Sequence, residues 1–239
     1  MLEEMMQPIR LPSKFLPYDK KEFYMRTFVG ADEKYLASIT YDNMERKFCD
    51  VLRRVSRGID PKDLTIGDRL YCLIWQAIHS YTKDYEVQGV CEHCFETFTT
   101  TIDLTTMDIK ELPDDYSEPK EVQLPVSKEV VKLRLFRVKD EIEIADYEKV
   151  HGESWLYRYA LSIVDDRNIM ERVRFLEKLP VKDLAIIRAF HEEYRHGPTM
   201  EVTYVCPKCG GSGVMPVPFR LDLFLPSGKA VARSLGNRI

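Results

Sequence analysis

The chain has 239 residues, of which 44% are hydrophobic and 31% charged, and its 35 basic and 39 acidic residues give a formal net charge of −4. This is the composition of a globular protein with one large domain or two small ones, and nothing in it demands nucleic acid as a partner. No apolar run approaches the roughly 20 residues of a membrane span, and residues 1–12 lack the apolar core of a secretory signal. We therefore expect synthesis in a reducing, cytoplasmic compartment.

The first part of the chain is expected to be an extended arm that leads into helices. Three prolines break any helix within residues 1–30, although residues 23–28 could form a strand. Thr65 or Asp63 is the expected cap of a central helix. Apolar residues at three- and four-residue spacing predict helices at residues 31–39, 42–57 and 66–81.

The second of these helices carries a cluster of basic side chains opposite its apolar face. The cluster could meet an acidic partner, but a solvated helix face is the simpler interpretation. Its members are Arg46, Lys47, Arg53, Arg54 and Arg57.

The first of two Cys-x-x-Cys motifs follows the third predicted helix. Cys91 and Cys94 lie between alternating segments, residues 85–90 and 95–104, that predict the strands of a hairpin. His93 lies in the same turn and could replace a sulfur as a metal ligand. An exposed histidine that binds no metal is the simpler interpretation, because four thiolates already suffice.

Residues 105–150 are interpreted as a linker and a β insertion. Prolines and acidic residues typical of linkers precede an alternating segment at 130–138, which is expected to pair with a strand around 122–124. Helical spacing predicts helices at residues 139–150, 154–164, 168–178 and 181–194.

The second motif, Cys206-Pro-Lys-Cys209, also lies between two predicted strands. These strands are expected at residues 202–205 and 214–225, the second broken by Pro216 and Pro218. The tail after them, residues 226–239, is expected to be flexible unless a partner holds it.

Together the two motifs predict one metal site. Two cysteines separated by two residues in a tight turn can direct both sulfurs at one ion, and structural zinc takes four such thiolates at about 2.3 Å. Pro207 and Gly210 are typical of the turn of a zinc knuckle. Because four protein thiolates leave no position for substrate, we expect a structural rather than a catalytic Zn²⁺. The predicted ligands are Cys91, Cys94, Cys206 and Cys209.

Other interpretations of the cysteines remain open. Cys49 and Cys72 lie singly in apolar helical patterns and are expected to be small core residues. Thioredoxin-like redox motifs begin a helix directly after a strand, whereas strand-like residues follow Cys94 and glycines follow Cys209. A redox role is therefore disfavoured, and ordinary buried thiols are the remaining alternative.

The surroundings of the two motifs indicate an internal repeat. Each motif is preceded by Lys-Asp-Leu and a helix, and each is followed by a strand that ends in Asp-Leu. Since neither half can hold zinc alone, the two halves, residues 31–104 and 151–225, are expected to pack face to face. The predicted fold is α+β: a helix-rich body whose short antiparallel β-hairpins form a four-cysteine, zinc-ribbon-like clasp from two related helix–hairpin halves.

No feature of the sequence indicates a catalytic site. The sequence contains none of the common phosphate-binding, dinucleotide-binding, zinc-protease or serine-hydrolase motifs, and no spacing of carboxylates singles out an acid/base pair. His151 and His196 are scattered, and His191, beside two glutamates, is expected on the surface. We therefore expect the protein not to be an enzyme.

Three stretches of the chain resemble the baseplate hub proteins of T4-type, contractile-tailed bacteriophages. The likeness covers mainly residues 8–105, and these stretches are Leu11-Pro-Ser-Lys-Phe-Leu-Pro-Tyr18, Leu64-Thr-Ile-Gly-Asp-Arg69, and the segment from Tyr85 through Cys94 to Asp103-Leu104. It implies a structural or assembly component of the baseplate, in the hub or its immediate surroundings, that acts by protein–protein binding. Such a protein would be made in the host cytoplasm and located in the virion tail. Its partners would be other baseplate and tail proteins, in an assembly that could be symmetric.

The main alternative is a zinc-ribbon protein that binds nucleic acid or acts in transcription. Arg53, Arg54 and Arg57 could contact phosphate groups. The net acidic charge and the lack of aromatic residues interleaved with basic ones near the motifs argue against this alternative.

Overall fold

The computed structural model describes residues 5–228, 231–232 and 236. Within these ranges it has seven α-helices, and each lies within three residues of the ends predicted from apolar spacing. No helix in the same ranges is long and apolar enough to cross a membrane. The helices are α1 (Gly30–Leu36), α2 (Met44–Val55), α3 (Ile66–Ser80), α4 (Val138–His151), α5 (Trp155–Ser162), α6 (Ile169–Lys178) and α7 (Val181–Glu193).

The strands are short, and every named pairing between them is antiparallel, so the prediction of a mixed α and β fold is confirmed. A three-stranded sheet has the order β1-β2-β3, and the other four sheets are two-stranded. The strands are β1 (Gln7–Pro8), β2 (Tyr24–Met25), β3 (Ser56–Arg57), β4 (Asp84–Val90), β5 (Thr97–Asp103), β6 (Ile109–Lys110), β7 (Lys120–Gln123), β8 (Val130–Leu133), β9 (Gly197–Pro198), β10 (Glu201–Val205) and β11 (Ser212–Pro216).

Helix α3 is the centre of an N-terminal body that also contains α1, α2 and the arm before them. Thr65 caps α3 as predicted, because its hydroxyl accepts the backbone N–H of Asp68 at 3.3 Å. Cys49 of α2 and Cys72 of α3 are both buried in the core, as their apolar surroundings predict. The arm contributes Leu11, Phe23 and Met25 to the same core. These side chains anchor the arm on the N-terminal body.

A second lobe, residues 112–194, has its own hydrophobic core. The predicted hairpin in this lobe is confirmed, since β7 pairs with β8 and places Val131 and Leu133 in the core. The strand ends at Leu133 rather than at 138, because the backbone N–H of Arg134 turns to the carbonyl of Ser162 at 2.9 Å. The predicted units 105–150 and 151–225 both contribute to this core.

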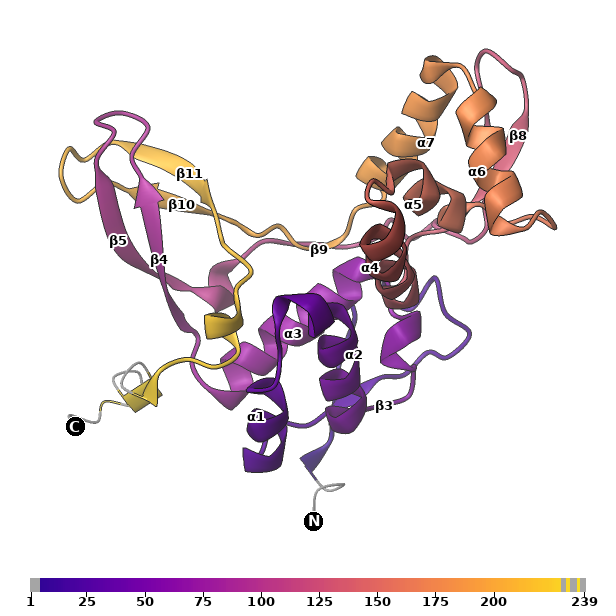
Figure 1. Ribbon diagram of the computed structural model, residues 1–239. Helices are drawn as coiled ribbons and strands as arrows, with labels where there is room; N and C mark the ends of the chain where they lie inside the picture. The colour runs from indigo at the N-terminus through magenta and orange to yellow at the C-terminus, as the bar shows by residue number, and fades with distance from the viewer. Residues whose placement is uncertain (1–4, 229–230, 233–235, 237–239) are drawn as a thin grey trace.

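The two hairpins that carry the cysteines lie outside both helical groups. In Figure 1 they and the second lobe project from α1–α3 on opposite sides, and the chain passes between the lobe and the hairpins through the β6–β9 pair. We call the hairpins β4–β5 and β10–β11 the clasp, and the β6–β9 pair the strap. After β11 the chain returns to the N-terminal body, where Phe224 packs on Phe48 with ring centroids 4.9 Å apart. β11 ends at Pro216, one of the two prolines expected to break the strand predicted at 214–225, and no named strand follows it within the described residues.

The strap lies directly against the first turn of α3, and two glycines make this approach possible. A Cβ atom at Gly67 would lie 2.3 Å from the carbonyl oxygen of His196, and one at Gly197 would lie 2.5 Å from the carbonyl oxygen of Gly67. Gly197 also has φ +93°, a backbone conformation that favours glycine. The contact therefore depends on the absence of both side chains.

A buried polar network joins the arm, α3 and the strap. Asp68 accepts the backbone N–H of Ser13 at 2.9 Å and the hydroxyl of Tyr18 at 2.5 Å. Burial, together with the Asp68 charge, raises the pKa of Tyr18 well above its usual value, so this hydroxyl stays a donor. The Thr65 hydroxyl lies 2.7 Å from Nε2 of His196. His196, which the sequence leaves unassigned, is thus a structural residue of this junction.

The expectation that His191 lies on the surface is wrong. Its ring stacks on Phe136 with centroids 4.0 Å apart, and its Nε2 atom is buried with no hydrogen-bond partner among the described residues. Burial, with the nearby charges of Arg134 and Arg158, lowers its pKa to about 3. Glu192 and Glu193, which follow it, are exposed. Their charge suggests an exposed helix face, although the His191 side chain itself points inward.

A pair of substitutions tests the contact between strap and helix. Gly67 and Gly30 both lie in the first turn of a helix, but a Cβ at Gly30 meets nothing within 4 Å. We expect Gly67→Ala to lower the free energy of unfolding by about 2 kcal/mol, because the strap must move. Gly30→Ala should raise it by about 0.5 kcal/mol through helix propensity. Urea unfolding measures both, and equal effects would contradict the proposed contact.

Candidate metal centre

The clasp consists of two hairpins that pack through their inner faces. The register of β4–β5 runs from Asp84↔Asp103 to Val90↔Thr97, and that of β10–β11 runs from Glu201↔Pro216 to Val205↔Ser212. Each cysteine pair therefore lies in the turn at the end of its hairpin, where the alternating segments predict it.

A small apolar layer holds the hairpins together. The rings of Phe98 and Tyr204 lie with centroids 4.9 Å apart. A Cβ at Gly89 would lie 2.8 Å from Sδ of Met215, so this glycine allows the two inner faces to approach closely. Because isolated two-stranded hairpins are marginal in water, this layer alone is a weak basis for order.

The two cysteine turns have the same backbone hydrogen bonds. In the first, the N–H of Cys91 donates to the carbonyl of Glu96 at 3.0 Å, and the N–H of Phe95 donates to the carbonyl of Cys91 at 2.8 Å. In the second, the N–H of Cys206 donates to the carbonyl of Gly211 at 2.8 Å, and the N–H of Gly210 donates to the carbonyl of Cys206 at 2.9 Å. The residue after each second cysteine has a positive φ, +59° at Phe95 and +72° at Gly210.

These turns bring all four predicted ligands together. The four sulfur atoms lie within 4.8 Å of one another. Cys91 Sγ is 3.7 Å from Cys209 Sγ, and Cys94 Sγ is 3.8 Å from Cys206 Sγ. Four sulfurs bound tetrahedrally at about 2.3 Å lie about 3.8 Å from one another, so the arrangement fits zinc. These separations are far longer than a disulfide bond of about 2 Å.

The pKa values of the thiols indicate why a cation suits this site. The backbone N–H groups of Cys94 and His93 stabilise the thiolate of Cys91 and lower its pKa to about 6. For Cys94, the N–H of Glu96 acts in the same direction, but burial and the neighbouring sulfurs outweigh it and raise the pKa to about 12. The Cys91 thiol therefore ionises readily, and ionisation of the Cys94 thiol beside it is disfavoured. A bound divalent cation removes this repulsion and allows all four to ionise.

Polar contacts around the sulfurs connect one turn to the other. The Tyr204 hydroxyl accepts the backbone N–H of Glu92 at 3.0 Å, and Lys208 pairs with Glu96 at 2.7 Å. His93 is exposed, and its Nε2 donates to the carbonyl of Ser212 at 3.0 Å. His93 is not part of the sulfur group. The Cys-x-x-Cys spacing does not indicate these contacts, because each joins residues more than 100 positions apart.

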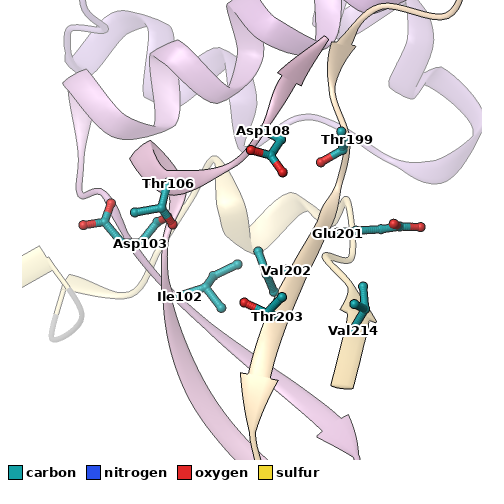
Figure 2. A pocket seen from close by; sticks show the side chains of 9 residues that line it. All are labelled: Ile102, Asp103, Thr106, Asp108, Thr199, Glu201, Val202, Thr203 and Val214. Atoms are coloured by element: carbon teal, nitrogen blue, oxygen red, sulfur yellow. The ribbon is translucent and has the colours of Figure 1, made fainter. Parts of the chain in front are cut away.

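A pocket of about 390 Å³ lies on the clasp near the strap (Figure 2). Three acidic residues line it, but Figure 2 shows the side chains of Asp103 and Glu201 pointing in different directions, away from Asp108. Asp103 is already engaged by Lys83 and by the N–H of Thr105, and Lys83 is the main cause that lowers its pKa to about 2. The pocket thus presents no converging acid/base pair, and its nine lining residues include no histidine or cysteine.

The family model for T4 bacteriophage base plate protein matches residues 9–225 of the chain. The match includes both cysteine motifs and the second lobe, and it therefore extends well beyond the resemblance seen in residues 8–105. No curated protein and no solved structure matches the chain.

Metal analysis of purified protein tests the assignment of the ligands. We expect about one zinc per chain in the wild type, and loss of the metal in Cys91→Ser or Cys206→Ser, since three thiolates with a hydroxyl bind zinc weakly. Cys49→Ala is the matched control, because Cys49 lies in the N-terminal core, outside the sulfur group, and this variant should keep its zinc. Wild-type protein that contains no zinc and is as stable as the zinc-loaded protein would contradict the metal centre.

Acid should release the metal. Cys91 has a lowered pKa in the folded chain, so its thiolate contributes stability above the ordinary thiol pKa of 9.0 and loses that contribution as the pH falls through about 6. Zinc competes with protons for the same sulfurs, so the amount of bound zinc should fall as the pH falls. Zinc retained after equilibrium dialysis at several pH values measures the release. Retention that does not depend on pH as far as acid unfolding of the chain would contradict thiolate ligands.

Proposed function

The chain belongs to the T4 bacteriophage base plate protein family, and we propose that it is a structural or assembly component of a contractile-tail baseplate, in the hub or its immediate surroundings. In this role it binds other baseplate and tail proteins and catalyses no reaction. Its place is the virion tail, after synthesis in the host cytoplasm, and the assembly around it could be symmetric. The observation that supports this function best is the family match over residues 9–225.

We also propose that Cys91, Cys94, Cys206 and Cys209 hold one structural Zn²⁺ in a zinc-ribbon-like clasp. The sulfur separations and the matching hydrogen bonds of the two turns support this proposal. They also support two related halves as far as the hairpins are concerned. The helices differ, since the buried residues of α3 share a core with the clasp and those of α7 belong to the second lobe.

The contacts between the lobes suit a scaffold whose parts keep a fixed arrangement. Arg137 at the start of α4 donates to the carbonyl of Pro17 at 3.3 Å, and the backbone N–H of Val138 donates to the carbonyl of Leu64 at 3.0 Å. Lys139 pairs with Asp63 at 2.9 Å across the same junction. The buried ion pair between Arg137 and Glu118 holds this guanidinium in place from within the second lobe.

The structure gives little support to the nucleic-acid alternative. The four basic side chains of this cluster that lie on α2 all have partners within the chain, which leaves less positive charge for phosphate groups. Arg46 pairs with Asp146, Arg53 with Asp50 and Asp60, and Arg54 with Asp32, while Lys47 lies over the ring of Tyr35.

Purified baseplates from the phage that encodes this chain test the proposed function. We expect mass spectrometry to find the chain in complete baseplates or in their assembly intermediates, at a fixed ratio to the other components. Absence from both would contradict the proposal. Retention of the zinc-loaded chain on a DNA column at physiological ionic strength, with elution by salt, would favour the nucleic-acid alternative instead.

A further inference from the structure

The tip of the clasp presents an aromatic side chain in an unfavourable position. Phe95 follows the second cysteine of its turn, has φ +59°, and is 79% exposed. It belongs to neither hydrophobic cluster of the described residues. The chain thus holds a bulky apolar side chain in water, on backbone that glycine would adopt at less cost.

The second turn shows that the metal centre does not need this side chain. Gly210 occupies the matching position, with φ +72° and the same hydrogen bond from its N–H to the carbonyl of the first cysteine. Glycine at position 95 would therefore serve the turn at least as well. Strained residues persist where they contribute to something other than the fold, and an observed outlier of this kind supports a functional hypothesis.

The surroundings of Phe95 define the chemistry of a partner. Glu92 and Glu96 of the same turn are exposed, and Lys208 of the second turn is paired with Glu96. A zinc ion with four thiolates adds a net negative charge. Val90, at the end of β4 in the same hairpin, is a second exposed apolar residue, at 59%. The tip is therefore an aromatic anchor within an anionic rim.

We propose that Phe95 anchors the clasp in an apolar pocket, edged by lysine or arginine, on a neighbouring protein of the baseplate. The proposal rests on the proposed function and names the surface through which it acts. A phenyl ring buried at the centre of an interface contributes much of the binding energy, and complementary charges around it orient the partner. The turn is fixed by its hydrogen bonds and by the metal, so little flexibility is lost on docking.

A membrane is the other surface that an exposed aromatic residue can enter. The negative charges around Phe95 oppose approach to anionic lipids, which attract basic rather than acidic segments. The observations therefore favour a protein partner, and vesicle binding becomes one outcome of the test.

The central experiment replaces Phe95 and measures stability and assembly separately. Phe95→Gly should keep one zinc per chain and should not lower the thermal midpoint, which we expect to stay the same or to rise by up to about 4 °C. When the variant replaces the wild type in infected cells, its amount in purified baseplates should fall at least tenfold. A thermal midpoint that does not fall, together with lower incorporation into baseplates, distinguishes a docking residue from a structural one.

Val181→Ala is the matched control, because Val181 is 73% exposed on α7 of the second lobe, which projects from α1–α3 on the side opposite to the clasp (Figure 1). Its incorporation should stay within twofold of the wild type. Glu92→Lys, which changes only the charge of the rim, should lower incorporation and keep the zinc. Incorporation of Phe95→Gly at the wild-type level would overturn the proposal, as would a lower thermal midpoint for this variant.

Two further outcomes are decisive. If the wild-type chain is absent from baseplates and their intermediates, the proposed function fails, whereas normal incorporation of Phe95→Gly removes only the anchor. Phe95-dependent sedimentation of the zinc-loaded chain with vesicles of phosphatidylethanolamine and phosphatidylglycerol, with no effect on incorporation, would assign the tip to a membrane and overturn docking to a protein.

Discussion

The convergence of four sulfurs at one point is the constraint on which the rest of the structure depends. Thiolates this close repel one another: backbone N–H groups lower the pKa of Cys91, whereas burial and the neighbouring sulfurs raise that of Cys94. The chain must travel 112 residues between Cys94 and Cys206 to bring the two turns together. Closure of such a loop is entropically costly, and the binding energy of a structural metal is the kind of contribution that offsets it.

The intervening residues reduce the same cost by other means. The second lobe folds around its own core, and its two ends leave it close to α3. There the strap pairs β6 with β9, and Gly67 and Gly197 allow its backbone to lie directly on the first turn of α3. The His196–Thr65 contact and the Asp68–Tyr18 bond fix this junction from within. The long loop is thus held at its base, and the metal centre holds it at the far end.

The parts of this architecture that sequence can predict are those with a local period or a fixed spacing. Apolar spacing predicts all seven helices, alternation predicts the β7–β8 hairpin, and Cys-x-x-Cys predicts which sulfurs come together. The strap has two residues in each strand, too few to show any period. The burial of His191 depends on Phe136, 55 positions earlier, and no local pattern reports such a contact. The arm has no period either, although Leu11 and Phe23 are among its most buried residues.

The two cysteine turns differ in the residue after the second cysteine, which is Phe95 in one and Gly210 in the other. This difference shows which features of the turn the metal site requires and which side chains can vary. Both turns need a positive φ after the second cysteine, because the N–H at that position returns to the carbonyl of the first. Glycine satisfies this need at Gly210, so the requirement belongs to the backbone and not to any side chain. The apolar layer between the two hairpins is small, and Phe95 is not part of it. The phenyl ring at position 95 is therefore free of any role in the fold, and its direction into solvent makes it a property of the surface that the clasp presents to its neighbours.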